Sequence, residues 1–396
     1  MGVITAWRGR SAVGRKCLTV LACLAAIVLV CTACSSQPAP LGPGPALDAT
    51  YASPPAALGP ESDQARLYVA VDGDDDAPGT VQEPFRTIAK AADAATPGTT
   101  VIVADGTYEG ATVTRASGTQ DARIVYVAEH KWGAKLVGGA DDDDAVWRNY
   151  GDYVDIQGFD VSGPVPEGTG IGQSGPHGRI LENRVVGMSG NCMSADNNGY
   201  TLVDDDFVGN VVGRCGTSDL DHGIYPGGAG GTISNNISFG NAGFGIHCWH
   251  NCNRQVITNN LVFGNHEGGI LIGQGDGPNN GDVEADGMVV ANNIVVDNGA
   301  EGIRENGATG SDNRYLNNLV TDNGGDAIDL QSGQESGTVS TSPIFVNFQI
   351  DGSGDYRLQP YSAGVDAGTT DGAPPDDITG TPRPRGQGVD VGVFEQ

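Results

Sequence analysis

The chain has 396 residues, with 49 acidic and 21 basic side chains and a formal net charge of −28. A charge of this sign and size repels polyanions, so it excludes nucleic acid as a natural partner. The acidic residues are clustered, as in Asp72–Asp76 and Asp204–Asp206. Clustered carboxylates on the loops of an exported protein suit Ca²⁺, and the alternative is a solvated acidic surface.

The amino terminus has the pattern of an export signal. Basic residues precede an almost wholly apolar run, Leu18–Val30, which is too short for a comfortable membrane span. The run ends in Cys-Thr-Ala-Cys-Ser-Ser, which resembles a bacterial lipoprotein cleavage site with Cys34 as the lipidated residue. A plain signal peptide is the alternative. We expect a signal peptide over 1–34 and a flexible Pro/Ala/Ser-rich linker over 35–65. The protein would then lie on the extracellular side of the bacterial membrane, held only by its lipid anchor, or be secreted.

A short amphipathic helix is predicted where the folded part begins. The apolar residues that recur at helical spacing are Phe85, Ile88, Ala89, Ala92 and Ala95, and a Pro-Gly pair ends the run.

The region from residue 170 to 330 contains several copies of one sequence motif. Asn-Asn pairs are followed nine or ten residues later by a small residue and an isoleucine. Between these marks lie short β-branched runs separated by Gly, Asn and Asp, which indicate strands and turns. Three strands of ~4 residues plus turns make ~22 to 25 residues, so the repeat predicts a parallel β-helix. The marks are Ile171, Met193, Ile224, Ile246, Ile270, Ile303 and Ile328.

We interpret the asparagines as a structural ladder. Asn tolerates the left-handed backbone that a tight turn needs, and its amide can hydrogen-bond to the copies above and below. A ligand site is the alternative. The isoleucines would form an inward-facing stack, and the neighbouring glycines would form the corner of each coil.

Four cysteines lie beyond the predicted signal and anchor. An even number in an exported chain is compatible with two disulfides. Cys192 and Cys215 are 23 residues apart, about one coil, so stacking would bring them together. Cys248 and Cys252 would close a small local loop. A zinc site is the alternative, because two histidines interleave with the second pair.

Two coils are longer than the others, with 31 residues from Met193 to Ile224 and 33 from Ile270 to Ile303. Insertions in a solenoid commonly build its binding face. The first insertion carries Asp219 and Asp221, and the second carries Asp276. Four of the six histidines fall between residues 222 and 266, and this concentration is the main functional signal in the sequence.

The residue after each mark points outward if the mark points inward. Tyr225, His247 and Arg304 would therefore share one face. Tyr225 and His247 would lie ~5 Å apart at their backbones, and Arg304 ~10 Å further along the axis. The neighbouring candidates for sugar contact are Trp249, His250 and Glu267, and those for calcium are Asp219, Asp221 and Asp276.

Both ends of the predicted fold resemble one superfamily. Residues 67–110 resemble the opening of bacterial right-handed parallel β-helix proteins of the pectate-lyase superfamily, and Ser342–Phe345 and Asp390–Glu395 resemble their closing segment. The resemblance implies an all-β fold, a single right-handed parallel β-helix over 66–396, in which the N-terminal helix caps the open end. A cap of this kind protects an exposed edge from aggregation.

The phrase Asp221-His222-Gly223-Ile224 resembles the active-site motif of alginate epimerases and related β-helix lyases. The resemblance implies removal of the C5 proton of a uronate, which requires its carboxylate to be neutralised. The groups implied are His222, His247 or Tyr225 as base and acid, Arg304 or a bound cation against the carboxylate, and Asp221 as an orienting group or calcium ligand. The alternative is that Asp221 caps a turn and His222 is structural.

Every lysine lies at or before Lys135, so a lysine base, common in calcium-dependent pectate lyases of this fold, is impossible in the central coils. One alternative function is a glycoside hydrolase that pairs Asp219 or Asp221 with Glu267. Another is a non-catalytic glycan-binding protein with Trp249 as a stacking platform. In each case the partner is an extracellular or cell-wall polysaccharide, and we expect a monomer.

Overall fold

The computed structural model describes residues 65–139, 144–163, 165, 168–195, 202–274 and 283–396. The predicted signal peptide, the lipidation site Cys34, the linker up to residue 64 and the proposed calcium ligand Asp276 lie outside the described residues. In the described ranges, no helix is both long and apolar enough to cross a membrane.

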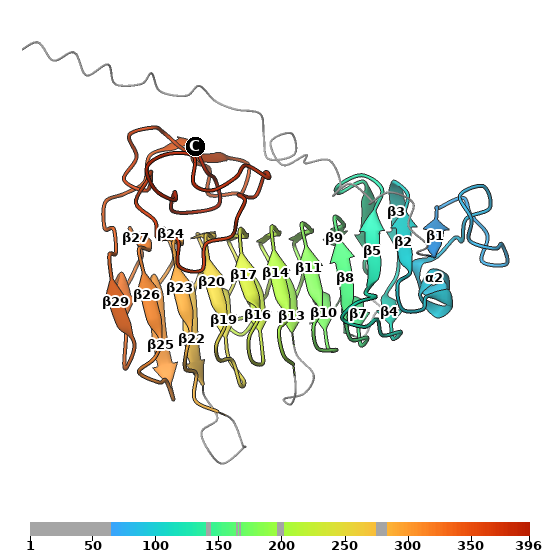
Figure 1. Cartoon of the computed structure of the whole chain (residues 1–396), viewed down its shortest axis with the longest axis horizontal. Helices are drawn as coiled ribbons and strands as arrows, with labels where there is room; N and C mark the ends of the chain where they lie inside the picture. Colours follow the sequence, from blue (N-terminus) through green and yellow to red (C-terminus); the bar gives the residue numbers. More distant parts are fainter. Residues whose placement is uncertain (1–64, 140–143, 164, 166–167, 196–201, 275–282) are drawn as a thin grey trace, which may run out of the picture. The chain divides into compact units, whose positions relative to one another are not determined.

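Three parallel sheets, here called A, B and C, form the three walls of a coil whose successive turns stack on one another (Figure 1). Sheet A has eleven strands: β1 (Arg66–Val69), β2 (Thr100–Val103), β5 (Ile124–Ala128), β8 (Val154–Gln157), β11 (Arg179–Leu181), β14 (Asp206–Val208), β17 (Thr232–Ser234), β20 (Val256–Thr258), β23 (Val289–Ala291), β26 (Arg314–Leu316) and β29 (Gln334–Ser336).

Sheet B has nine strands: β3 (Gly106–Glu109), β6 (Ala134–Val137), β9 (Asp160–Ser162), β12 (Arg184–Val186), β15 (Val211–Gly213), β18 (Ile237–Phe239), β21 (Leu261–Phe263), β24 (Ile294–Val296) and β27 (Leu319–Thr321). Sheet C also has nine: β4 (Thr112–Thr114), β7 (Ala145–Asn149), β10 (Thr169–Gln173), β13 (Met193–Ala195), β16 (Ile224–Pro226), β19 (Phe244–Cys248), β22 (Gly268–Gln274), β25 (Ile303–Gly307) and β28 (Ile328–Asp329). Each coil gives one strand to A, then B, then C, so the predicted all-β parallel β-helix is confirmed.

The apolar marks read from the sequence form one inward row of sheet C. Ile171 pairs with Met193, Met193 with Ile224, and Ile224 with Ile246, and the register continues to the end of the sheet. All of them from Ile171 to Ile303 are fully buried. The repeat arithmetic therefore placed the core correctly.

The two residues of each Asn-Asn pair have different structural roles, a turn for the first and a ladder for the second. The first asparagine of each pair holds the left-handed turn, as at Asn259 with φ +53° and Asn292 with φ +56°. The second forms the ladder: the Asn236 backbone N–H donates to Oδ1 of Asn260 at 2.9 Å, and that of Asn260 donates to Asn293 at 3.0 Å. The ladder asparagines are completely buried, so each amide needs the partner that its neighbour supplies.

The glycines beside the marks are not corners, contrary to expectation. Gly245 and Gly269 lie within β19 and β22. A Cβ atom on Gly245 would collide with Val262, and one on Gly269 would collide with Val295. These valines belong to sheet B, so glycine is needed because the sheet C backbone passes directly against sheet B inside each coil.

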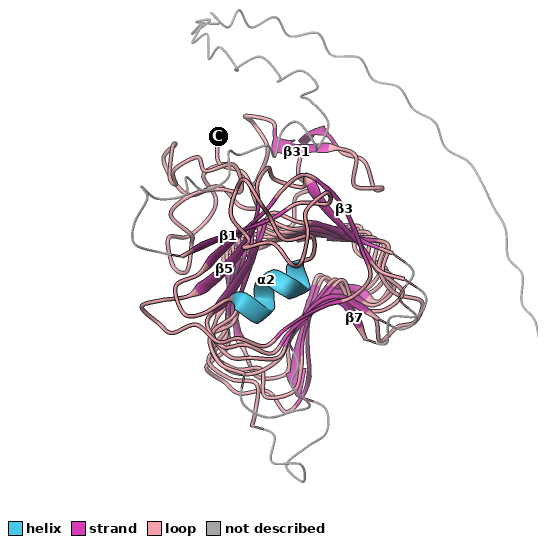
Figure 2. Cartoon of the chain, turned by 90° about the vertical axis from the view of Figure 1, so that its right-hand side faces the viewer, coloured by secondary structure: helices cyan, strands magenta, loops and turns pink. Residues whose placement is uncertain are grey.

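A helix covers the β1 end of the β-helix, as predicted (Figure 2). Helix α2 (Ile88–Ala94) begins after Thr87, whose hydroxyl accepts a hydrogen bond from the Lys90 amide. The helix starts later than its apolar spacing suggested, and it buries Ala91 while Ala89 is exposed. The prediction of Ala89 as a core position was therefore wrong, although the cap itself is present.

The residues after β29 leave the coil and pack on the outward face of sheet B (Figure 1). They include the antiparallel pair β30 (Phe345–Asn347) and β31 (Asp355–Leu358). Phe263 of sheet B contacts the rings of Phe348 and Tyr356, with centroids 5.2 and 5.0 Å away. This closing segment, residues 345–396, builds a second apolar core outside the coil.

The first asparagine of each pair also holds the closing segment. The side-chain amide of Asn235 donates to the carbonyl of Asp376 at 2.9 Å, and that of Asn317 donates to the carbonyl of Ala367 at 2.8 Å. Asn259 and Asn292 make equivalent bonds to the same segment. One repeated dipeptide therefore supports both the coil and its outer cover.

Candidate active site

His222 occupies the turn immediately before β16 and is almost completely buried. Its backbone N–H donates to Oδ1 of Asn191 at 2.6 Å. Its ring Nδ1 accepts a hydrogen bond from the Phe244 amide at 3.0 Å, and its Nε2 lies 2.5 Å from Nδ1 of His247. The preceding coil therefore holds the His222 backbone, and the following coil fixes the orientation of its ring.

These contacts determine where the ring protons lie. A backbone amide can only donate, so Nδ1 of His222 is unprotonated, and the proton of the neutral ring is on Nε2. That proton is donated to Nδ1 of His247, so the proton of neutral His247 is on its own Nε2. His247 therefore presents an N–H donor and has no free lone pair with which to accept a proton.

Burial keeps both rings neutral. Desolvation lowers the pKa of His222 to about 4, and the nearby Asp221 charge only partly opposes this shift. Desolvation, with smaller effects from His222 and His250, lowers the pKa of His247 well below its ordinary value. The Nε2 atom of His247 is buried and has no hydrogen-bond partner among the described residues. An unsatisfied donor of this kind favours any ligand that supplies an acceptor.

Tyr225 lies against this histidine pair on the outward side of β16. Its ring centroid is 5.3 Å from that of His222, in a stacked arrangement, and 5.4 Å from that of His247. The predicted proximity of Tyr225 and His247 on neighbouring coils is therefore present. The three side chains form one cluster on the outward face of sheet C.

A short loop closed by the Cys248–Cys252 disulfide borders the cluster. It carries Trp249, whose ring centroid is 5.3 Å from that of His247, and His250, 6.3 Å from Tyr225. The Trp249 ring also lies against Gly273 of the next coil, where a Cβ atom would collide with it. Both predicted disulfides are present, since Cys192 and Cys215 are also bonded, and the pairing of Cys248 with Cys252 favours the disulfide over the zinc alternative for this loop.

Arg304 lies on the same outward face, separated from His247 by Leu271 in the register of sheet C. Its guanidinium is 3.5 Å from the carboxylate of Glu301 and 4.0 Å from that of Asp329. The sequence placed Arg304 on the correct face, but it did not show that two carboxylates flank this side chain.

The acidic candidates are spread over neighbouring loops. The Asp221 carboxylate accepts hydrogen bonds from the amides of Thr217 and Ser218, so it caps a turn, which was the structural alternative. Asp219 is exposed, and Glu267 is paired with His266 at 3.3 Å. In the described part of the chain, no three His, Cys, Asp or Glu side chains are arranged to hold a metal ion. The calcium site therefore stays a prediction.

Two contacts to His222 were missed from the sequence. The Phe244 amide belongs to a backbone, and no side-chain pattern reports where a backbone N–H will point. Asn191 lies 31 residues before His222, one long coil away, so only a full register of the coils could have paired them.

A family model described as Pel9A-like, right handed beta helix region matches residues 67–336. The crystal structure of pectate lyase Pel9A aligns with a TM-score of 0.54 at 19% identity, covering 85% of this chain and 97% of that one. The structure of XylC with xylose aligns with a TM-score of 0.55 at 13% identity, covering 75% and 74%.

The A-module of mannuronan C-5 epimerase AlgE4 from Azotobacter vinelandii aligns with a TM-score of 0.51 at 15% identity, covering 68% of this chain and 76% of that one. At such identities these structures show the fold alone, and they agree with the predicted right-handed β-helix. No curated protein matches the sequence.

Proposed function

Because the chain belongs to the Pel9A-like right-handed β-helix family, we propose that it acts on a polysaccharide, removing the C5 proton of a uronate as a lyase or an epimerase. By their names, two of the similar structures are a pectate lyase and a mannuronan C-5 epimerase. The observation that carries the proposal is the cluster of His222, His247 and Tyr225 on sheet C.

In this proposal His247 is a donor. Removing the C5 proton moves negative charge onto the sugar carboxylate, and a preorganised N–H aimed at that charge lowers the barrier. The Nε2–H of His247 is unsatisfied but buried, so the proposal requires the neighbouring Trp249 ring to move before a substrate oxygen can accept from it. His222 is a positioning residue, because its hydrogen bond fixes the tautomer of His247.

Tyr225 is the proposed base. Both histidine rings are committed to the hydrogen-bonded pair, so neither has a lone pair available to C5. A deprotonated Tyr225 would accept the C5 proton. In a lyase the C4–O glycosidic bond would then break, a C4–C5 double bond would form, and the leaving oxygen would take a proton from Tyr225 or water. In an epimerase no bond to the neighbouring sugar would break, and water would deliver a new proton to the opposite face of C5. Trp249, His250 and Glu267 would contact neighbouring sugars, and Arg304 or Ca²⁺ would bind a second carboxylate.

The proposal also includes export, with lipidation at Cys34. A change of Cys34→Ser should release the protein from the membrane fraction into the medium. A wild-type protein found wholly outside the membrane fraction would argue for plain secretion.

Incubation with a panel of uronate and neutral glycans tests the reaction. Ultraviolet absorbance of an unsaturated sugar would report a lyase, and C5 exchange in heavy water would report an epimerase. New reducing ends without either signal would instead support a hydrolase that uses Asp219 and Glu267, because Asp221 is committed to its turn.

Variants of His247 test the mechanism. His247→Ala should lower kcat by ~10²- to 10⁴-fold, the usual contribution of a positioned proton-transfer or donor group. His247→Gln, which retains an N–H donor, should recover part of that loss. The matched control is His130→Ala, because His130 is an exposed histidine paired only with Asp105 in the described region. Equal activity of His247→Ala and His130→Ala would remove His247 from the mechanism.

A further inference from the structure

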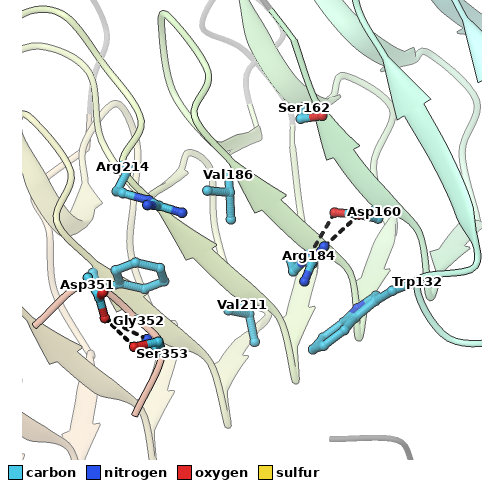
Figure 3. Close-up of a pocket in the computed structure, with 11 residues that line it drawn as sticks. Trp132, Asp160, Ser162, Arg184, Val186, Val211, Arg214, Asp351, Gly352 and Ser353 are labelled. Carbon is cyan, nitrogen blue, oxygen red and sulfur yellow. Dashed lines mark hydrogen bonds and ion pairs between the residues drawn. The ribbon is translucent and has the colours of Figure 1, made fainter. Parts of the chain in front are cut away.

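A pocket lies on sheet B, on a different sheet from the histidine cluster (Figure 3). Its volume is about 380 Å³, and it lies where the outward face of sheet B meets the turn at residues 351–353 of the closing segment. A cavity of this size accommodates one or two sugar rings.

The pocket lies where the outward row of sheet B changes from charged to apolar residues. The row begins with Lys135, Asp160 and Arg184, and it continues with Val211 and Ile237. The apolar part of this row is covered by the closing segment, whereas Asp160 and Arg184 line the open pocket. The pocket therefore combines a polar wall with the edge of an apolar one.

The apolar wall is Phe239, and its position depends on two glycines. A Cβ atom on Gly213, in the preceding coil, would collide with the Phe239 ring. A Cβ atom on Gly352, in the closing segment, would collide with it as well. Any other residue at either position would displace the ring from the pocket wall.

The polar wall is rigid. Arg184 forms two parallel hydrogen bonds with Asp160, at 2.9 and 2.8 Å, and its guanidinium lies 5.3 Å from the centre of the Trp132 ring. The Trp132 indole N–H is itself held by the carbonyl of Glu182 at 2.9 Å. Each Asp160 oxygen retains acceptor capacity, so the pair can receive sugar hydroxyls without rearranging.

Arg214 is the third element of the pocket. It follows β15 in a left-handed conformation with φ +54°, where the same turn carries Gly187 and Gly240 in the adjacent coils. The side chain is exposed, and its guanidinium makes no hydrogen bond and no ion pair within 4.0 Å to any described residue. Asp351 is near enough to be influenced by its charge, but that carboxylate accepts hydrogen bonds from Ser353.

We propose that this pocket binds one uronate unit of a glycan, away from the catalytic cluster. Arg214 would pair with the sugar carboxylate and the Arg184–Asp160 pair with ring hydroxyls. Phe239, which is only 3% exposed, would close the apolar side of the pocket without stacking on the sugar. The inference rests on the proposed substrate class. A second site of this kind would hold the same long chain on two sheets and raise its effective concentration at sheet C.

Calorimetric titration with trigalacturonate and trimannuronate tests the pocket, with xylotriose as the uncharged control. The wild type should bind a uronate probe at two sites. Arg214→Gly places in this coil the residue found in both neighbours, and it should weaken one site by about tenfold or more. The matched control is Arg254→Gly, since Arg254 is also exposed and left-handed, with φ +52°, and lies outside the pocket.

The outcomes separate this inference from the proposed function. Selective loss of one site in Arg214→Gly supports the pocket, even if the wild type turns over none of the uronates. Equal behaviour of the Arg214→Gly and Arg254→Gly proteins, or stronger binding of xylotriose, would overturn it. Turnover of a uronate with only a single, Arg214-independent site would leave the reaction intact and remove the pocket.

Discussion

Sheets B and C arise from the same repeat, yet their outward rows are opposite in character. The outward row of sheet C includes Tyr225, His247 and Arg304. The corresponding row of sheet B includes Ile237 and Leu261, which the closing segment buries. In a β-strand the inward residues are fixed by the core, so only the outward ones can specialise. The contrast shows that the outward side chains of sheet C are uncovered at the histidine cluster, whereas those in the covered part of sheet B are structural.

The strongest test of this contrast is to damage the covered face. Phe263→Ala removes a fully buried ring that contacts Phe239, Phe348 and Tyr356. It should lower the free energy of unfolding by about 3–5 kcal/mol. Denaturant titration measures this loss. Turnover per folded molecule should stay unchanged, and a matching fall in turnover would show that the two faces are coupled.

A smaller effect should come from acid. In the unfolded chain His222 becomes protonated below pH ~6.5, whereas in the folded chain it becomes protonated only below about pH 4. The unfolded state therefore holds more protons in this window. Stability should fall as the pH decreases through it, by up to about 1.4 kcal/mol per pH unit. Above pH ~6.5 the contribution is complete.

Thermal melting of wild type and His222→Gln across this window measures the effect. The variant should show a flatter slope. Asp390 acts in the opposite direction, since burial raises its pKa to about 6, so only the difference between the two proteins isolates His222. Identical slopes would mean that His222 is not held neutral. Because the histidines stay neutral, catalysis should not be lost near pH ~6.5.

The smallest expected effect is a difference in the free energy of unfolding between variants of the two residues of an Asn-Asn pair. Asn293→Ala breaks the buried ladder: the Asn260 backbone N–H loses its acceptor, and Oδ1 of Asn318 loses the side-chain donor of Asn293, which should cost about 1–3 kcal/mol. Asn292→Gly keeps the left-handed turn and loses the side-chain bonds to Thr369 of the cover and the 3.2 Å bond to Asn259, which should cost about 1 kcal/mol. Chemical denaturation of the two variants compares them, and equal losses would refute the division of roles.

Much of the coil could be predicted because its signals are periodic. The spacing of Ile224, Ile246 and Ile270 specified the inward row, and strand alternation then placed Tyr225 and His247 together. The direction of the hydrogen bonds could not be predicted. That His222 accepts from the Phe244 amide, and so determines the tautomer of His247, depends on where one backbone N–H points.

The pocket on sheet B could not be predicted from the sequence either. Arg214 and Asp351 are 137 residues apart in number, and they meet because the closing segment folds back over the coil. A repeat describes how each coil contacts the next, and it contains no information on a segment that crosses many coils. The same reason explains why the cover over sheet B was not foreseen.

The asparagines that hold the closing segment have a consequence for the timing of assembly. The Asn235 amide bonds to a carbonyl 141 residues later, and Arg383 reaches back to Asn235 across 148 residues. Coils can add one after another as the chain emerges, because each contacts only its neighbour. The apolar outward row of sheet B stays uncovered until residues 345–396 have been made, and contacts of such long range form slowly. A partly synthesised chain would therefore expose an apolar, aggregation-prone face that this segment later buries.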